Sequence, residues 1–242
     1  MKAEAAELTG KVAIVSGGSG AIGSAIIDAL AQAGARAISL DLSEPKRNHP
    51  WIHCNIREES SVIAAVESVY KTEGRLDLVV HAAGISHDSV IWKMSTEEWD
   101  SVQAVNLRGA FLLLRHSIPL LRRGPGGRIV LIGSINGSRG KFGTSAYSAS
   151  KAGLLGLAKS VAREIGRFGI LINVVEPGWV RTPLTEAVPR AIQDGALAES
   201  LLGCFLEPAD VAASVLFLCG AGAAHITGQI LRVDGGQYLG GT

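Results

Sequence analysis

Cysteine is scarce in this sequence, and its arrangement excludes two kinds of cross-link. Cys54, Cys204 and Cys219 lie far apart and form no C-x-x-C pair. An odd number of widely spaced cysteines supports neither a disulfide framework nor a zinc site. The histidines, His81 among them, also lack the spacing of metal ligands. We therefore expect no metal site, and buried thiols in a reducing compartment.

The sequence also lacks an excess of either charge and any long apolar run. Its 242 residues include 23 Lys and Arg against 22 Asp and Glu, and 47% are hydrophobic. A protein that binds nucleic acid would usually carry a strongly basic region. The opening segment MKAEAAELTGK does not resemble a secretory signal, and no apolar run reaches the roughly 20 residues of a membrane span. We expect a cytoplasmic protein with no nucleic-acid or membrane partner.

What the sequence does have is a regular alternation of short apolar runs and longer segments with helical periodicity. Apolar strands separated by helices indicate a parallel sheet covered on both faces. No repeat, low-complexity segment or linker divides the chain, so residues 1–242 are expected to form a single domain. The expected fold class is α/β, a Rossmann-type doubly wound parallel sheet of seven strands with helices on both faces.

The expected strands are residues 11–16, 36–41, 51–54, 76–84, 127–134, 170–178 and 228–236. The expected helices are residues 21–34, 59–74, 96–121, 145–169 and 208–220. We expect Gly74 to end the second helix and Thr96 to be the N-cap of the third.

Residues 182–207 are the least patterned stretch of the chain and contain two prolines and two glycines. Long connections in compact domains are usually functional, so we predict a mobile substrate lid here. Apolar residues in and beside it, such as Trp179 and Phe205, favour a substrate with an apolar part. The same residues could equally pack the lid onto the body of the protein.

A glycine-rich turn, SGGSGAIG from Ser16 to Gly23, follows the first expected strand and opens directly into a helix. Glycines let the backbone turn tightly and approach a ligand, while a helix N-terminus offers free N–H groups to a diphosphate. In this strand-turn-helix context the turn predicts dinucleotide binding. The residues expected to contact the cofactor are Gly17, Ser19, Gly20, Ala21, Ile22 and Gly23.

Asp41 ends the second expected strand, 18 residues after Gly23. A carboxylate at this place can accept hydrogen bonds from both hydroxyls of an adenosine ribose, and it would repel a 2′-phosphate. Leu42 follows, and no lysine or arginine stands beside it. We therefore predict NAD(H) as the cofactor, with NADP(H) less favoured. The alternative is that Asp41 only caps a turn.

Tyr147 and Lys151 lie four residues apart in SAYSASKAG, so they share one face of a helix. The pKa of a free tyrosine is about 10, and a nearby ammonium lowers it toward a value useful for acid–base catalysis. The spacing alone is common in surface pairs. Ser134 favours catalysis, because it ends an expected strand 13 residues before Tyr147 and could hydrogen-bond a substrate oxygen beside the phenol.

With these motifs the whole chain resembles the short-chain dehydrogenase/reductase family, in its compact branch, and most of all the 3-oxoacyl-carrier-protein reductase group. The family's T-G-x-x-x-G-x-G motif is similar to SGGSGAIG, with Ser16 and Ala21 as departures. Its N-N-A-G motif appears as HAAG from His81 to Gly84, which loses both asparagines, and its aspartate near the adenine appears as Asn55.

The resemblance implies a catalytic set of Asn106, Ser134, Tyr147 and Lys151. Tyr147 would move the proton, Ser134 would steady the substrate oxygen, and Lys151 would hold the nicotinamide ribose. Asn106 would hold a water that links Lys151 to solvent. Further cofactor contacts are implied at Leu42, Asn55, Ile56, Ala82, Ala83, Gly84, Tyr147, Lys151, Pro177, Gly178, Val180 and Thr182.

The implied function is NAD(H)-dependent interconversion of a secondary alcohol and a ketone, on a hydroxyacyl thioester or on a cyclic or aliphatic hydroxy compound. The alternative within the family is an NADPH-dependent 3-oxoacyl-carrier-protein reductase. Arginines that include Arg122 and Arg163 could bind a phosphopantetheine carrier, or could simply be solvated. The family also implies a homotetramer built on the helices at 96–121 and 145–169.

Three rival functions use a similar fold. A catalytically silent NAD-binding scaffold or sensor is disfavoured by the retention of all four catalytic positions. A methyltransferase would lack the Tyr147, Lys151 and Ser134 set. A sugar epimerase or dehydratase of the longer branch would carry a larger C-terminal substrate domain.

Overall fold

The apolar segments of the chain pair side by side, all parallel, in one seven-stranded sheet. The computed structural model describes residues 7–240. The order across the sheet is β3-β2-β1-β4-β5-β6-β7, which reverses direction after β1 and confirms the expected doubly wound fold. The strands are β1 (Val12–Ser16), β2 (Arg36–Asp41), β3 (Trp51–His53), β4 (Leu78–His81), β5 (Gly127–Ile132), β6 (Ile170–Pro177) and β7 (Ile230–Val233).

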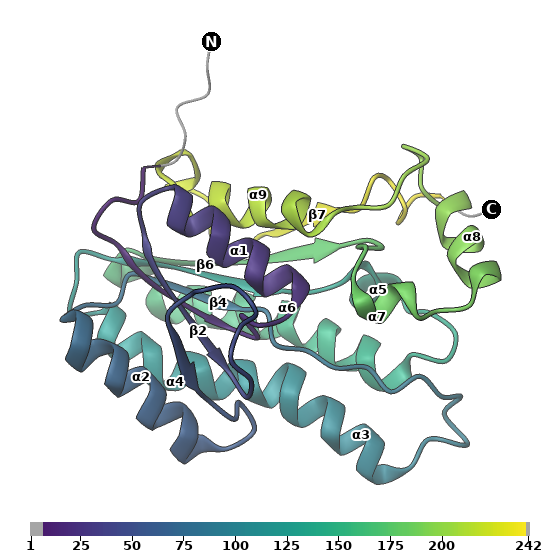
Figure 1. Cartoon of the computed structure of the whole chain (residues 1–242), viewed down its shortest axis with the longest axis horizontal. Helices are drawn as coiled ribbons and strands as arrows, with labels where there is room; N and C mark the ends of the chain where they lie inside the picture. Colours follow the sequence, from purple (N-terminus) through teal and green to yellow (C-terminus); the bar gives the residue numbers. More distant parts are fainter. Residues whose placement is uncertain (1–6, 241–242) are drawn as a thin grey trace.

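Helices cover both faces of this sheet. Alternate residues of β1 point to opposite faces, so Val12 and Ile14 join one core cluster while Ala13 and Val15 join the other. The first cluster is closed by α2 (Glu59–Glu73), α4 (Gly109–Leu121) and α6 (Ser145–Ile165). The second is closed by α1 (Ala21–Gln32) and α9 (Pro208–Cys219), which Figure 1 shows together above the sheet.

The helical segment expected at residues 96–121 has a wider turn in its middle. It consists of α3 (Thr96–Gln103), the π-helical turn η1 (Ala104–Arg108) and α4. The expectation that Thr96 caps this segment was wrong. Ser95 is the cap, because its Oγ accepts from Glu98 N at 3.1 Å while Ser95 N donates to the Glu98 carboxylate at 2.9 Å. This reciprocal pair needs a spacing of three residues, which Thr96 and Glu98 do not have.

Gly74 ends α2, as expected. Its φ of 72° lies in the left-handed region, where a glycine carries no steric penalty, and its N–H donates to Tyr70 O at 2.9 Å.

Several short helices that the sequence did not predict lie beyond the carboxyl ends of the strands. They are α5 (Ile135–Arg139), α7 (Pro183–Glu186) and α8 (Arg190–Ala198), with the 3-10 turns η2 (Gly166–Phe168) and η3 (Ala221–Ala223) elsewhere. Figure 1 shows β6 pointing toward the end of the molecule that holds α5, α7 and α8. The expected lid at 182–207 therefore contains two helices of its own.

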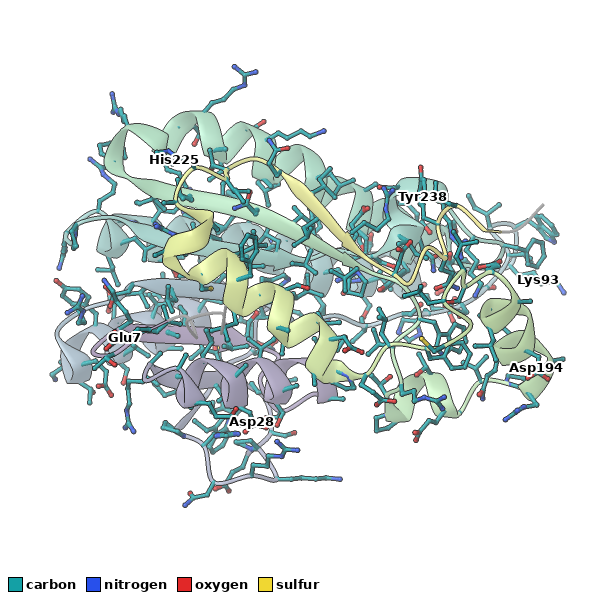
Figure 2. All side chains as sticks on the ribbon, turned by 90° about the horizontal axis from the view of Figure 1, so that it is seen from above. Glu7, Asp28, Lys93, Asp194, His225 and Tyr238 are labelled. Carbon is teal, nitrogen blue, oxygen red and sulfur yellow. The ribbon has the colours of Figure 1, made fainter. Side chains whose placement is uncertain are left out.

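The loops that follow β4, β6 and β7 gather at this same end. Figure 2 shows Lys93, Asp194 and Tyr238 there, with Glu7 and His225 at the opposite end. Within the described part of the chain, no helix is both long and apolar enough to cross a membrane. Ligands of open parallel sheets bind beyond the carboxyl ends of the strands, so this end is where a site is sought.

Candidate active site

The glycine turn brings the chain against the exit of the neighbouring strand. Gly17 has a φ of 72°, and a Cβ added to it would lie 2.6 Å from the backbone of Ala83. A Cβ on Gly23 would collide with the carbonyl of Gly17. Gly20 is the N-cap of α1 and has no side chain to cap the helix. The first N–H groups of α1 therefore stand free for an anionic ligand, as a diphosphate-binding turn requires.

Asp41 lies beside this turn. Its carboxylate accepts from Ser19 N at 3.0 Å and from Ser43 N at 3.3 Å. The backbone thus holds the carboxylate at the edge of the glycine turn, while the neighbouring Leu42 side chain is exposed. The predicted ribose-binding residues and the glycine turn are brought together by the pairing of β1 with β2.

Asn55, the residue expected near the adenine, uses its side chain in a local turn. Its Nδ2 donates to Glu58 Oε1 at 2.7 Å, and its Oδ1 accepts from Arg57 N at 3.2 Å. The following Ile56 is buried against Gly109 of α4.

The exit of β4 lies between the glycine turn and α6. Ala83 packs on Gly17, as described, and Ala82 N donates to Ser16 O at 3.0 Å. A Cβ added to Gly84 would lie 3.3 Å from Lys151 Nζ. The small residues Ala83 and Gly84 therefore let the exit of β4 approach both the glycine turn and Lys151 closely.

Ser134, Tyr147 and Lys151 meet where β5, α5 and α6 come together. Ser134 caps α5, because its Oγ accepts from Asn136 N at 3.2 Å. Tyr147 and Lys151 lie on the first two turns of α6, and Lys151 Nζ is 5.6 Å from the centre of the Tyr147 ring. Lys151 is 3% exposed and donates from Nζ to Ile132 O at 2.8 Å. The i, i+4 spacing thus does place both groups on one face.

Burial controls the charges of this pair. It raises the pKa of Tyr147, an effect that a hydrogen bond with Ser134 partly offsets and that Asp88 adds to. It lowers the pKa of Lys151 to about 8. The sequence-based expectation that Lys151 lowers the tyrosine pKa is wrong for this structure, since removal from water disfavours the charged form of both groups.

Asn106 lies in the π-helical turn and ties three segments together. Its Nδ2 donates to Ile85 O at 2.9 Å and to Ser150 Oγ at 3.0 Å, and its Oδ1 accepts from Ile85 N at 2.9 Å. Ser150 precedes Lys151 on α6. Asn106 therefore links the loop after β4 to the helix that carries Tyr147 and Lys151.

His81, to which the sequence assigned no role, is the most deeply buried histidine near the site. It is 0% exposed, and its ring lies between Ser16 Oγ at 2.8 Å and Asn106 O at 3.1 Å. Burial and the charge of Lys151 lower its pKa to about 3. The departure of HAAG from the family motif was the one signal in the sequence that pointed to this residue.

The loop after β6 carries the remaining predicted cofactor residues. Pro177 ends the strand, Val180 is buried, and Thr182 caps α7 by accepting from Thr185 N at 3.3 Å. A Cβ on Gly178 would lie 2.8 Å from Gln237 Oε1, so the chain after β7 packs directly on this loop.

A polar cluster that the sequence did not reveal ties the expected lid to the site. Arg139 of α5 pairs with Glu199, just past α8, at 2.7 Å and also donates to Gln237 O at 3.1 Å. Gln237, 3% exposed, donates to Glu199 Oε2 at 3.1 Å and accepts from Trp179 N at 2.8 Å. These residues come from three distant parts of the chain, so no local pattern could predict the cluster.

The arrangement can hold a dinucleotide along the carboxyl edge of the sheet and present a phenol to a substrate oxygen. The free end of α1, the close approach at Gly17 and the fixed Asp41 carboxylate fit such a cofactor. Among the residues described by the structure, no cluster of His, Cys, Asp or Glu could hold a metal ion.

Comparison with known proteins agrees with this geometry. The sequence model of the family described as Enoyl-(Acyl carrier protein) reductase matches residues 10–237. The 3-oxoacyl-(acyl-carrier-protein) reductase FabG of Thermotoga maritima is 35% identical over 245 residues, covering 96% of this chain and 99% of that protein. Its Escherichia coli counterpart is 36% identical, covering 95% and 98%. The acetoacetyl-CoA reductase of an Acinetobacter strain is 35% identical, also covering 95% and 98%.

Solved structures share the whole fold. The crystal structure of gox2181 has a TM-score of 0.93 at 33% identity, covering 96% of this chain and 97% of that one. The aldohexose dehydrogenase of Thermoplasma acidophilum, in ligand-free form, has a TM-score of 0.91 at 31% identity, covering 97% and 96%.

Proposed function

This chain belongs to the short-chain dehydrogenase/reductase family, and from that membership we propose that it uses NAD(H) to interconvert a secondary alcohol and a ketone. The family model covers residues 10–237, and relatives at about 35% identity extend over almost the full length. The chain is thus an oxidoreductase acting on CH–OH groups. The cofactor preference, the residue roles and the substrate are the proposal.

The observation that carries the cofactor preference is the position of Asp41. Its carboxylate is held by the N–H groups of Ser19 and Ser43 at the edge of the glycine turn. A carboxylate there accepts from the two ribose hydroxyls of NAD and repels the 2′-phosphate of NADP. The exposed Leu42 beside it brings no positive charge that would compensate.

Four residues of this chain carry the proposed acid–base chemistry. In oxidation the Tyr147 phenolate takes the proton from the substrate hydroxyl, while Ser134 hydrogen-bonds the same oxygen as it becomes a carbonyl. Lys151 holds the ribose of the nicotinamide half. Asn106 holds the main chain after β4 and the start of α6 in register, through Ile85 and Ser150.

The cofactor would lie along the edge of the sheet. The glycine turn would hold its diphosphate, Asp41 and Leu42 its adenosine ribose, and Ile56 its adenine side. Ala82 to Gly84 and Pro177 to Thr182 would flank its nicotinamide half. When bound, the nicotinamide supplies the hydride transfer, and the protein supplies position and electrostatics.

We propose a hydroxyacyl thioester, or a cyclic or aliphatic hydroxy compound, as substrate. Relatives at 35% identity are named for the reduction of acyl thioesters, and a structural neighbour is named for aldohexose oxidation. The second candidate is an NADPH-dependent 3-oxoacyl-carrier-protein reductase, which several relatives at 34–36% identity favour by name. We also propose a homotetramer, and a role for residues 182–207 as the substrate lid.

Titration of NADH and NADPH against nicotinamide fluorescence tests the cofactor preference without any substrate. We expect the wild type to bind NADH at least about tenfold more tightly, and Asp41→Ala to lose or reverse this preference. Asp100→Ala, an exposed aspartate on α3, is the matched control and should bind both cofactors as the wild type does.

Equal affinities, or tighter binding of NADPH by the wild type, would reject NAD(H) and favour the carrier-protein reductase. If neither cofactor binds, both the NAD(H)-dependent activity and an NAD-binding scaffold are rejected. A screen of 3-hydroxyacyl-CoA thioesters and cyclic alcohols with the preferred cofactor then identifies the substrate class.

A further inference from the structure

We propose that His81 is a positioning residue of the active site, which holds the main chain at Asn106 through a neutral imidazole with its proton on Nε2. Its kinetic consequences rest on the proposed function. The hydrogen bonds themselves do not, so the two can be tested separately.

The ring of His81 bridges two elements that meet under the catalytic residues. His81 ends β4 and lies in register with Ser16, which ends the neighbouring β1. Nδ1 is 2.8 Å from Ser16 Oγ, and Nε2 is 3.1 Å from the carbonyl oxygen of Asn106 in the π-helical turn. All three residues are buried, so no water replaces a partner that is lost.

The partners determine where the proton lies. A carbonyl oxygen can only accept, so Nε2 must carry the hydrogen that faces Asn106. In a neutral ring Nδ1 then accepts, and the Ser16 hydroxyl donates to it. Burial, aided by the repulsion of the Lys151 charge, lowers the pKa of His81 to about 3, although the hydrogen bond with Asn106 acts in the other direction. The ring therefore stays neutral at any pH at which the enzyme would work.

Asn106 couples the hydrogen bond of His81 to the helix that carries Tyr147 and Lys151. Its side chain accepts from the N–H of Ile85 and donates to the carbonyl oxygen of Ile85. It also donates to the Ser150 hydroxyl, which in turn donates to the backbone carbonyl oxygen of Tyr147 at 2.7 Å. Without the donor on His81, the Asn106 carbonyl is buried without this partner, and the wide turn can relax toward a regular helix. The Asn106 side chain would then rotate away from Ile85 and Ser150.

The first experiment observes the proton directly. Long-range ¹H–¹⁵N spectra of the ¹⁵N-histidine-labelled protein, without cofactor or substrate, distinguish the two tautomers. The His81 signals are assigned by their absence in His81→Gln. We expect a neutral Nε2–H ring between about pH 5 and pH 9. A ring protonated on Nδ1 alone, or one that titrates in this range, overturns the proposal.

The second experiment uses two substitutions of graded similarity. His81→Leu removes both polar contacts at similar size, and His81→Gln keeps an N–H donor near the place of Nε2. We expect kcat to fall roughly tenfold or more in His81→Leu and to recover most of that loss in His81→Gln. His225→Leu, at the far end of the molecule in Figure 2, is the matched control and should keep the wild-type kcat.

The pH profile separates positioning from loss of folded protein. A misplaced Asn106 changes the surroundings of Tyr147 and Lys151. The acid limb of the kcat–pH profile should therefore move to higher pH in His81→Leu and return to its wild-type position in His81→Gln. A lower kcat with an unmoved limb in folded His81→Leu, or no rescue by His81→Gln, contradicts the proposal.

The two proposals fail in different ways. If His81→Leu does not fold, the tautomer of the wild-type ring and the pH profile of kcat in His81→Gln still test the positioning role of His81. A wild type inactive on every alcohol and ketone counts against the proposed function, whereas the tautomer still tests the hydrogen bonds of His81.

Discussion

Burial raises the pKa of Tyr147 and lowers the pKa of Lys151. Both shifts have the same cause, because removal from water disfavours the charged form of each group. A phenolate beside an ammonium is therefore costly in this pocket unless other groups support it. Ser134 is the group that does so here, because its hydrogen bond acts against the rise in the tyrosine pKa. In the proposed mechanism Ser134 thus stabilises the phenolate in addition to its hydrogen bond with the substrate oxygen.

Tyr147→Phe should abolish turnover while preserving the cofactor site. Removing the phenolic oxygen removes the proton acceptor, so kcat should fall about 10²- to 10⁴-fold. The dissociation constant for NADH, measured by fluorescence, should change little. Tyr70→Phe on α2 is the control and should turn over as the wild type does. A folded Tyr147→Phe with more than a tenth of the wild-type kcat would show that another group moves the proton.

Lys151→Met should reveal the cost of burying the lysine through the pH dependence of stability. The pKa of Lys151 is about 8 in the folded protein against an ordinary 10.5, so between these values the unfolded chain binds more protons. Wild-type stability must then rise with pH, relative to the variant, by roughly 3 kcal/mol in all.

Urea unfolding of both cofactor-free proteins across this pH range measures the difference in the free energy of unfolding. Other titrating groups are common to the two proteins and cancel in the comparison. A difference that is constant with pH would mean that Lys151 is not desolvated as the structure has it.

At the scale of elements, the expected lid is joined to the body by polar contacts in addition to apolar packing. Glu199 receives hydrogen bonds from Arg139 of α5 and from Gln237 of the C-terminal segment. Because Ser134 is the N-cap of α5, the expected lid is tied to the same short helix that Ser134, a proposed catalytic residue, caps. If residues 182–207 act as the proposed lid, a movement of α8 would strain the contact of Glu199 with Arg139 of α5.

Glu199→Gln should loosen residues 182–207. It removes the charge of a partly buried ion pair but keeps the shape of the side chain, so limited proteolysis of this stretch should become several-fold faster. Asp194→Asn, on α8 itself, breaks the exposed pair with Arg190 and should change little. Equal rates in the two variants would show that the Arg139 contact does not hold the lid.

At the scale of the whole molecule, parallel pairing of distant segments builds the site. The reversal of strand order at β1 and β4 places the glycine turn beside the HAAG exit. On the outer side, α4 and α6 present exposed small and apolar residues, among them Phe111, Ala152 and Gly156. Such a face allows close packing against a second copy of the chain.

Gly156→Leu should therefore lower the oligomeric state. A Cβ at Gly156 meets nothing within 4 Å inside the subunit, so we expect the monomer to tolerate the added side chain and the proposed interface to lose its close packing. Light scattering should show a tetramer for the wild type and a smaller species for the variant. Gly195→Leu, an equally open glycine on α8, is the control. A wild-type monomer, or a tetrameric Gly156→Leu, would reject this interface.

Local chemistry made much of this protein predictable from its sequence. Strands and helices have different periodicities, so all seven strands and the main helices were predicted. The short helix α5 after β5, and the short helices within residues 182–207, were not predicted. The four-residue spacing of Tyr147 and Lys151 sets a common helix face by itself. The Asp41 and glycine-turn pairing follows from the βαβ order. Thr96 was misjudged because the box that caps α3 starts one residue earlier.

Only the tertiary structure decided the rest, because the partners come from segments that the sequence does not show to be neighbours. His81 meets Ser16 across 65 residues and Asn106 across 25, and Arg139 meets Gln237 across 98. The pKa directions of Tyr147 and Lys151 also depend on burial, which is a property of the packed molecule. Sequence periodicity determines which elements form and which faces are apolar. The contacts between their ends, where the chemistry is expected, depend on how the sheet is assembled.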